Sequence, residues 1–293
     1  MESSYKKIVA VVIPRYRTNL SSDEMISLNH LTTHLGKYDK FFIVPDDLSI
    51  DTDHFYFKKF GRSYFEDVYG YNELMLSKEF YESFEAYSFI LIYQLDCLVF
   101  SDQLLEWCEK DYDYIGAPWF DSGMSRVKKF SVGNGGFSLR KVDRFIEVLR
   151  KRVNPKDRLI QRSKAIADLF LYAKPKRQMK RFFASLMDGE VMTCVKEKYR
   201  FAKRIIGHYS GNEDTFWSYE AKKYFPEFKV APPEVALSFA FEADPRYCYQ
   251  KNHYSLPFGC HAWAKYDRSF WGPYLISRSN GVLIDEVGME QPV

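Results

Sequence analysis

The most constraining feature of the chain is the order of its first three segments, which alternate between strand-like and helix-like patterns. Residues 6–14 (KKIVAVVIP) form an apolar run typical of a buried parallel strand. Residues 21–36 have a possible N-cap at Ser22, apolar side chains at helical spacing and a stop at Gly36. Residues 40–47 form a second strand-like run. This β-α-β order predicts an open α/β sheet that binds ligands at the carboxyl ends of its strands.

The later segments predict a mixed sheet flanked by helices. The chain has 293 residues, enough for one large α/β domain or two modest ones. The longest strand-like run, residues 89–100, is expected to be the central strand. Further strands are expected at 54–60, 112–119 and the start of 131–152, helices at 71–87, 102–111, the rest of 131–152 and 211–226, and a strand with a loop at 229–242.

The five cysteines form no CxxC pair, which argues against a zinc ribbon or a thioredoxin-type site. Their odd number and the size of the chain favour reduced thiols in the cytoplasm. The apolar run near the N-terminus stops at Pro14, so it is short for a signal peptide and far too short to span a bilayer. We therefore expect a cytoplasmic protein.

The basic residues are concentrated in one block. Residues 151–204 contain 16 Lys or Arg against 5 Asp or Glu, a net charge of +11, which leaves −8 for the rest of a chain whose total is +3. Such a block indicates either a solvated set of helices or a contact with an anionic surface such as lipid head groups, phosphates or nucleic acid.

The expected central strand contains an acid where burial would be costly. In ILIYQLDCLVF (90–100), Gln94 and Asp96 are two residues apart, which on a strand would put both side chains on the same face. A carboxylate beside an amide oxygen is a reasonable half-site for a hard divalent cation. The alternative is a structural carboxylate held by backbone N–H groups or by an arginine.

Three other motifs carry polar groups at predicted loops. VGNGGFSLR (132–140) has three glycines in five residues, which permits a tight turn or a close approach of backbone to ligand. GNEDTFWS (211–218) places Glu213 and Asp214 at the start of a helix, where they could cap it or act as a general base. In PFGCHAW (257–263), His261 is either a packed side chain or a further metal ligand.

The order of these motifs resembles that of the GT-A class of nucleotide-sugar glycosyltransferases. More closely, YQLDCLVF, YDYIGAPW, VGNGGFSLR, NEDTFW and PFGCHAW resemble the signature blocks of a bacterial family of unknown function related to that class. The resemblance runs from about Val9 to Trp263, with little contribution from residues 153–206. It implies a single GT-A-like domain at 1–276, made of a nucleotide-binding half (1–130) and an acceptor half (131–276) with a basic helical insertion at 151–206, and a tail at 277–293.

The resemblance also implies a metal-dependent, inverting transfer of a sugar from a nucleotide-sugar donor, with UDP as the expected nucleotide. Asp96 corresponds to the second acid of the DxD-type motif that binds Mn²⁺ or Mg²⁺, and His261 to the late metal-binding histidine. Gln94 replaces the first acid of that motif and adds no charge. Asp214 is the expected catalytic base, and Glu213 would bind donor or acceptor hydroxyls.

The remaining implied contacts are with the donor and the acceptor. The backbone N–H groups around Asn134 would lie against the sugar, Arg17 would be near the diphosphate, and Asp46 would be near the base or ribose. Two indoles would stack on sugar faces. In full, the implied donor- and acceptor-binding residues are Arg17, Asp46, Gln94, Trp119, Gly133, Asn134, Gly135, Gly136, Glu213 and Trp217.

The implied acceptor is a glycan or a lipid-linked saccharide of bacterial surface polysaccharide synthesis. The basic block would then hold the enzyme peripherally on the anionic inner leaflet of the cytoplasmic membrane. Two other functions stay open. One is a non-catalytic protein that binds nucleic acid or another anionic surface through residues 151–204, although that block lacks the interleaved aromatics of single-strand binders. The other is a glycoside hydrolase with Asp96 and Asp214 as paired carboxylates.

Overall fold

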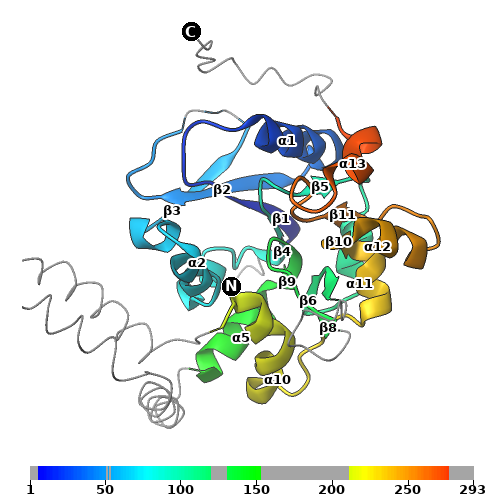
Figure 1. Cartoon of the computed structure of the whole chain (residues 1–293). Coiled ribbons are helices and arrows are strands. Elements are labelled where there is room, and N and C mark those ends of the chain that lie inside the picture. The colour runs from blue at the N-terminus through cyan, green and yellow to red at the C-terminus, as the bar shows by residue number, and fades with distance from the viewer. Residues whose placement is uncertain (1–5, 51, 53, 120–130, 153–210, 277–293) are drawn as a thin grey trace, which may run out of the picture. The chain divides into compact units, whose positions relative to one another are not determined.

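A computed structural model describes residues 6–50, 52, 54–119, 131–152 and 211–276. Its centre is a six-stranded sheet with the strand order β3-β2-β1-β4-β9-β6 (Figure 1). The strands are β1 (Lys7–Pro14), β2 (Asp39–Pro45), β3 (Tyr56–Phe60), β4 (Tyr87–Tyr93), β6 (Tyr114–Gly116) and β9 (Phe137–Lys141).

The sheet is mixed. Strands β1 to β4 are mutually parallel where they pair, whereas β9 runs antiparallel to both β4 and β6. The carboxyl ends of β1, β2 and β4 therefore lie along the same edge of the sheet. The predicted α/β class with a mixed open sheet is confirmed.

Helix α1 (Ser22–Leu35) supplies the crossover between β1 and β2. A capping box starts it, in which Ser21 and Glu24 each accept a hydrogen bond from the other's backbone N–H. Leucines of α1 pack with alternate residues of β1 in the main core, and the side chains between them face the other side of the sheet. Figure 1 shows α1 and α2 (Val68–Met75) on opposite sides of the sheet.

The other helical segments are short. Residues 71–87, expected as one helix, divide between α2 and α3 (Lys78–Glu82), because Ser77 caps a new helix with a hydrogen bond from Phe80 N–H. The remaining segments are η1 (Arg62–Phe65), α4 (Leu104–Glu109), α5 (Val142–Arg152), α9 (Glu213–Thr215), the π-helical η2 (Phe216–Glu220), α10 (Ala221–Tyr224), α11 (Pro233–Phe239), α12 (Pro245–Lys251), α13 (Arg268–Trp271) and η3 (Gly272–Tyr274).

The prediction of one central strand over residues 89–100 was wrong. β4 ends at Tyr93, the chain turns with a hydrogen bond from Cys97 N–H to the Gln94 carbonyl, and β5 (Leu98–Val99) joins another sheet. That sheet has the order β10-β11-β5, with β10 (Ala240–Phe241) and β11 (Gly259–Cys260). The strand expected within 229–242 is mostly helix α11, which Pro233 starts at its first turn. A third sheet pairs β7 (Pro118–Trp119) with β8 (Ser131–Val132).

Contacts divide the chain into two units, one formed by residues up to 148 and from 213 on, and the other by residues 149–212. The sheets and the site described below belong to the first unit. Most of the basic block and of the expected insertion at 151–206, as well as the tail at 277–293, lie outside the described residues. In the described part of the chain, every helix is too short or too polar to cross a lipid bilayer.

Candidate active site

The turn after β4 carries two of the predicted metal-binding groups. Gln94 continues the pairing of β4 with β9 through a hydrogen bond from its N–H to the Gly136 carbonyl. The chain then leaves the sheet, and Asp96 is held by a hydrogen bond from Trp263 N–H to its carbonyl. The two side chains thus meet at a turn rather than on one face of a strand.

His261 is brought to this turn by the small sheet. It follows β11, which is antiparallel to β5, so the start of β5 and the end of β11 are neighbours. Its Nε2 lies 3.2 Å from Gln94 Oε1 and 3.4 Å from Asp96 Oδ1. The structure therefore brings Gln94, Asp96 and His261 together, as the motif order led us to expect.

The donor set at this corner fits a divalent cation. The Asp96 side chain is 50% exposed, but its Oδ1 is buried and has no hydrogen-bond partner among the described residues. A buried carboxylate oxygen that no donor satisfies is costly. Carboxylate and amide oxygens together with an imidazole nitrogen suit Mn²⁺. We refer to Gln94, Asp96 and His261 as the acidic corner.

The acidic corner carries little negative charge for a metal site. Among the residues that the structure describes, no group of three His, Cys, Asp or Glu side chains is arranged so that it could hold a metal ion by itself. A cation there would have two ionisable ligands and one neutral amide. Gln94 adds no negative charge, so these three side chains alone would leave coordination positions of a cation open.

Two neighbouring carboxylates raise the pKa of His261. Burial disfavours the charged ring, but contact with Glu242 and the negative charge of Asp96 outweigh burial and raise the pKa above its usual value. The ring is thus surrounded by groups that favour a positive charge. A cation bound at the acidic corner would be stabilised by the same negative charges.

The glycine-rich segment forms a wall behind the acidic corner. Asn134 adopts a left-handed conformation with φ of 74°, and its Oδ1 accepts hydrogen bonds from the N–H groups of Gly136 and Phe137. Gly133 N–H donates to the carbonyl of Ala117. The Gly133 and Gly136 N–H groups therefore already have acceptors within the protein, and the expected contact of the backbone at Gly133, Gly135 and Gly136 with a sugar stays a prediction.

Gly135 and Gly136 are needed because other side chains of the site lie very close to their backbone. A Cβ at Gly136 would lie 2.3 Å from His261 Nε2 and 2.8 Å from Gln94 Oε1, and one at Gly135 would lie 1.8 Å from Glu213 Oε1. Neither position has room for a side chain unless the site moves.

This geometry makes a prediction for Gly136→Ala. The added methyl would push His261 away from Gln94, so we expect cation-dependent nucleotide binding to weaken by at least about 10-fold, as 1.4 kcal/mol corresponds to one factor of ten. Gly272→Ala is the matched control, because a Cβ there meets nothing within 4 Å. Calorimetric titration of both variants tests this, and native affinity in Gly136→Ala would contradict it.

Glu213 is held in a fully buried ion pair. Its Oε1 lies 2.8 Å from Arg140 Nη2, and both side chains are almost completely buried, at 4% and 0% exposed. Arg140 also donates to the Gly135 carbonyl, Ser138 Oγ and Tyr81 OH. Burial raises the pKa of Glu213 to about 7, against the opposing effect of Arg140. This pairing accounts for one carboxylate oxygen only.

The second carboxylate oxygen of the pair, Glu213 Oε2, is buried without a hydrogen-bond partner among the described residues. Tyr71 OH is buried as well and makes no hydrogen bond of good geometry there, with the Gln94 side chain as its nearest candidate partner. Burial raises the pKa of Tyr71, and the charge of Glu213 raises it further while Arg140 and Gln94 oppose the shift. The Tyr71 hydroxyl is thus close enough to Glu213, Arg140 and Gln94 to interact electrostatically with each of them. A hydroxyl-rich ligand could satisfy both atoms.

Asp214 lies at the start of the short helix α9, with Oδ1 accepting a hydrogen bond of 2.6 Å from Thr215 N–H. Burial raises its pKa, and the nearby negative charge of Glu242 raises it further. A carboxylate with a raised pKa is a better proton acceptor than an ordinary aspartate. Asp214 therefore has the electrostatic character of a general base.

Comparison with known proteins identifies the family. The family model described as "Protein of unknown function (DUF5672)" matches residues 54–261. The chain belongs to the DUF5672 family. The expectation of a family of unknown function is thereby confirmed. No curated protein matches the sequence.

Solved structures offer remote likenesses to this DUF5672 protein. Two structures of the glycosyltransferase GlyE from Streptococcus pneumoniae TIGR4 have TM-scores of 0.41, identities of 11% and 12%, and coverage of 92% of this chain and 60% of theirs. The chain thus spans about 60% of the length of the GlyE structures. The galactosyltransferase LgtC, in complex with donor and acceptor sugar analogs, has a TM-score of 0.45 at 12% identity, covering 90% of this chain and 92% of its own.

Two predicted phosphate and nucleotide contacts of the DUF5672 protein follow β1 and β2, at the same edge of the sheet. Arg17 is paired with Glu24 of the α1 capping box, Nη2 to Oε2 at 2.7 Å. Asp46 is exposed, and its N–H donates to the Phe60 carbonyl. These contacts do not join either residue to the acidic corner, so their roles stay predictions.

The two predicted stacking indoles have different places. Trp119 is half-buried, packs its ring against Gly133 and lies 6.3 Å from the Tyr219 ring. Trp217 is 0% exposed and packs against Phe145 with ring centroids 3.8 Å apart. Trp217 is therefore a core residue with no free face for a sugar, and its predicted role is withdrawn.

Sequence reasoning missed Glu242, Arg140 and Tyr71. Glu242 directly follows the apolar run ALSFAF, an acid at the end of a strand as Asp96 was, and could have been found by the same argument. Arg140 lies within VGNGGFSLR, but its role requires a partner 73 residues away. Nothing in the helical pattern around Tyr71 marks it as more than a packed aromatic.

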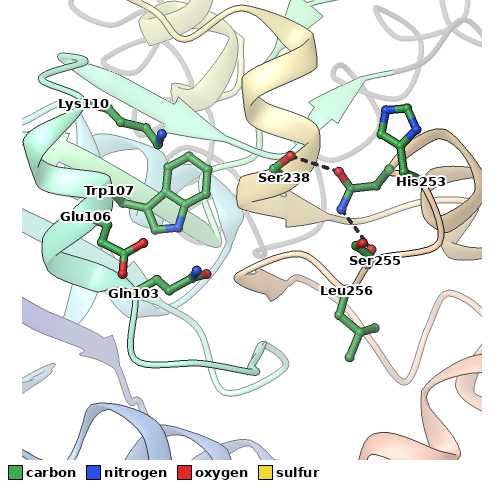
Figure 2. A pocket seen from close by; sticks show the side chains of 9 residues that line it. Gln103, Glu106, Trp107, Lys110, Ser238, His253, Ser255 and Leu256 are labelled. Carbon is green, nitrogen blue, oxygen red and sulfur yellow. Dashed lines mark hydrogen bonds between the residues drawn. The ribbon is translucent and has the colours of Figure 1, made fainter.

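The DUF5672 protein also has a surface groove of about 410 Å³ away from the acidic corner. Figure 2 shows Gln103, Glu106 and Trp107 of the α4 region facing Ser238 and the loop after α12. The groove lies toward the far ends of β5 and β11, beyond the hydrogen bond from Phe100 N–H to the Phe258 carbonyl. None of the predicted site residues lines it.

Proposed function

We propose that this protein is a glycosyltransferase that moves a sugar from a nucleotide-sugar donor, with UDP as the first nucleotide to test, to a hydroxyl of a glycan or lipid-linked acceptor. One observation carries the proposal. Asp96 Oδ1 is buried, lacks a donor among the described residues and faces His261 Nε2 and Gln94 Oε1 at the carboxyl end of β4. This is the edge at which open α/β sheets bind nucleotides.

The acidic corner would hold Mn²⁺ or Mg²⁺ through Asp96 and His261, with Gln94 as a neutral neighbour. When bound, such a cation offsets the negative charge that grows on a departing diphosphate. Gly136 lets the backbone lie close behind these side chains, since a Cβ there would lie only 2.3 Å from His261 Nε2. The donor is then fixed by its diphosphate.

Asp214 would take the proton from the acceptor hydroxyl. The hydroxyl oxygen forms a bond to the anomeric carbon, the bond from that carbon to the diphosphate oxygen breaks, and the electron pair leaves with the nucleoside diphosphate. Direct displacement inverts the anomeric centre. The raised pKa of Asp214 supports this assignment, because a base works best when its pKa approaches the working pH.

The partly satisfied buried groups would bind donor hydroxyls. Glu213 Oε2 can accept a hydrogen bond, and Tyr71 OH can donate or accept one. Arg140 holds Glu213 in place and neutralises part of its charge. A sugar bound here would satisfy atoms that are otherwise costly to bury.

Titration calorimetry of the full chain with UDP, GDP and CMP, each with and without Mn²⁺, tests the proposal. We expect one nucleotide to bind only when Mn²⁺ is present. Binding of nucleic acid in a salt-dependent manner with no nucleotide binding would favour the anionic-surface alternative. Cleavage of a glycoside without any nucleotide would favour the hydrolase.

A further inference from the structure

Glu242 is a carboxylate at the acidic corner to which no role has been given. It directly follows β10, and His261 directly follows β11. The two strands are parallel and pair Phe241 with Cys260, so the backbone register places Glu242 beside His261. A hydrogen bond of 2.9 Å from His261 N–H to the Phe241 carbonyl continues that register.

The side-chain contact is on the far side of the ring from Asp96. Glu242 Oε1 lies 3.1 Å from His261 Nδ1, whereas Nε2 faces Gln94 and Asp96. The carboxylate is 17% exposed and the ring 15%, so water competes little for this contact. An ionised carboxylate only accepts hydrogen bonds, so it favours a proton on Nδ1.

A second neighbour favours the opposite arrangement. Asn134 Nδ2 lies 2.8 Å from the same Nδ1. The amide cannot turn around, because its Oδ1 already accepts from Gly136 N–H and Phe137 N–H. An amide N–H favours a bare Nδ1, which puts the ring proton on Nε2, where it can be donated to Gln94 or Asp96.

We propose that Glu242 is the positioning residue that holds His261 in the Nδ1–H tautomer required for cation binding, in competition with Asn134, which stabilises the Nε2–H tautomer. The exchange moves one proton from Nε2 to Nδ1 and leaves the charge of the ring unchanged. Glu242 thereby leaves the Nε2 lone pair, on the side of the ring that faces Asp96, free to bind a cation. The inference rests on the proposed cation site, and it adds a residue that acts through a ligand rather than on the cation.

The test measures cation affinity and tautomer, not turnover. We would titrate Mn²⁺ alone into native protein, Glu242→Gln, Glu242→Ala and the control Glu234→Gln, an exposed carboxylate of α11. Loss of an outer-shell partner of this kind typically weakens metal binding by about 10- to 100-fold. We expect such a loss in Glu242→Ala, a smaller one in Glu242→Gln, whose carbonyl still accepts from Nδ1–H, and none in Glu234→Gln.

The ring proton is followed by ¹⁵N NMR of labelled histidines, of which the chain has six. His261→Asn assigns the signal. Addition of diamagnetic Mg²⁺ should move the His261 signal of the native protein to the pattern of the Nδ1–H tautomer. Under the same conditions, Glu242→Ala should keep a larger fraction of the Nε2–H tautomer. Thermal unfolding of each variant checks that the fold is kept.

The outcomes separate the two proposals. Native Mn²⁺ affinity in Glu242→Ala, with binding abolished in Asp96→Asn, would overturn the positioning role and leave the cation site standing. Loss in Glu242→Gln as complete as in Asp96→Asn would make Glu242 a ligand and also overturn it. If native protein binds no Mn²⁺, the cation site fails and the role of Glu242 fails with it.

Discussion

Asp96→Asn is expected to abolish Mn²⁺-dependent nucleotide binding. The substitution keeps the size of the side chain but removes the negative charge that lies 3.4 Å from His261 Nε2. The charge stabilisation supplied through a metal site amounts to several kcal/mol, so we expect affinity to fall by at least about 100-fold. Calorimetry with the nucleotide and Mn²⁺ measures this directly.

The matched control for this experiment is Asp102→Asn. Asp102 is 42% exposed and pairs with Lys37 on the surface, six residues beyond Asp96. Exposed pairs of this kind contribute about 1 kcal/mol or less, so stability and nucleotide binding should both stay close to native. Unchanged nucleotide binding in Asp96→Asn would leave Asp96 as a structural carboxylate and remove the basis of the transferase proposal.

Asp214→Asn is expected to reduce the rate of sugar transfer by about 100- to 10,000-fold, the usual contribution of a positioned general base. Nucleotide binding should be kept, because the cation ligands are untouched. Asp214 is active when ionised, so the rate should fall as the pH drops through its pKa. Since burial raises that pKa, the acidic limb of the native profile should lie above the ordinary range of aspartate.

The pH profile distinguishes a base from a residue that only shapes the site. In Asp214→Asn the acidic limb due to this carboxylate should disappear, and the residual rate should depend less on pH. Glu220→Gln is a suitable control, since Glu220 lies six residues later in a surface pair with Lys223. A native rate and an unchanged limb in Asp214→Asn would exclude Asp214 from the proton transfer.

Much of the sheet was predictable because its signals are local. The run KIVAVVIP is β1, and the capped segment after it is α1, close to the expected bounds. Both follow from apolar spacing and end signals that involve neighbouring residues only. The same pattern predicts Asp96 near the carboxyl end of its strand, although the structure places it in the turn after β4.

The errors arose where the next contact was distant in the sequence. Residues 94–97 leave the sheet because β5 pairs with β11, some 160 residues later, and an unbroken apolar run does not reveal that change of partner. Trp217 is predicted to stack on a sugar, yet its ring packs against Phe145 in the core. A residue's place after a motif does not determine the direction of its side chain.

By itself, the sequence determined the class of fold, the family and the chemical groups that could form a site, since these depend on local pattern and on motif order. Only the tertiary structure decided which groups meet. The register of β10 with β11 places Glu242 on His261, and the pairing of β5 with β11 places His261 on Asp96. The physical reason is that hydrogen-bonded strand pairing fixes contacts between residues far apart in the chain, and no local pattern encodes its register.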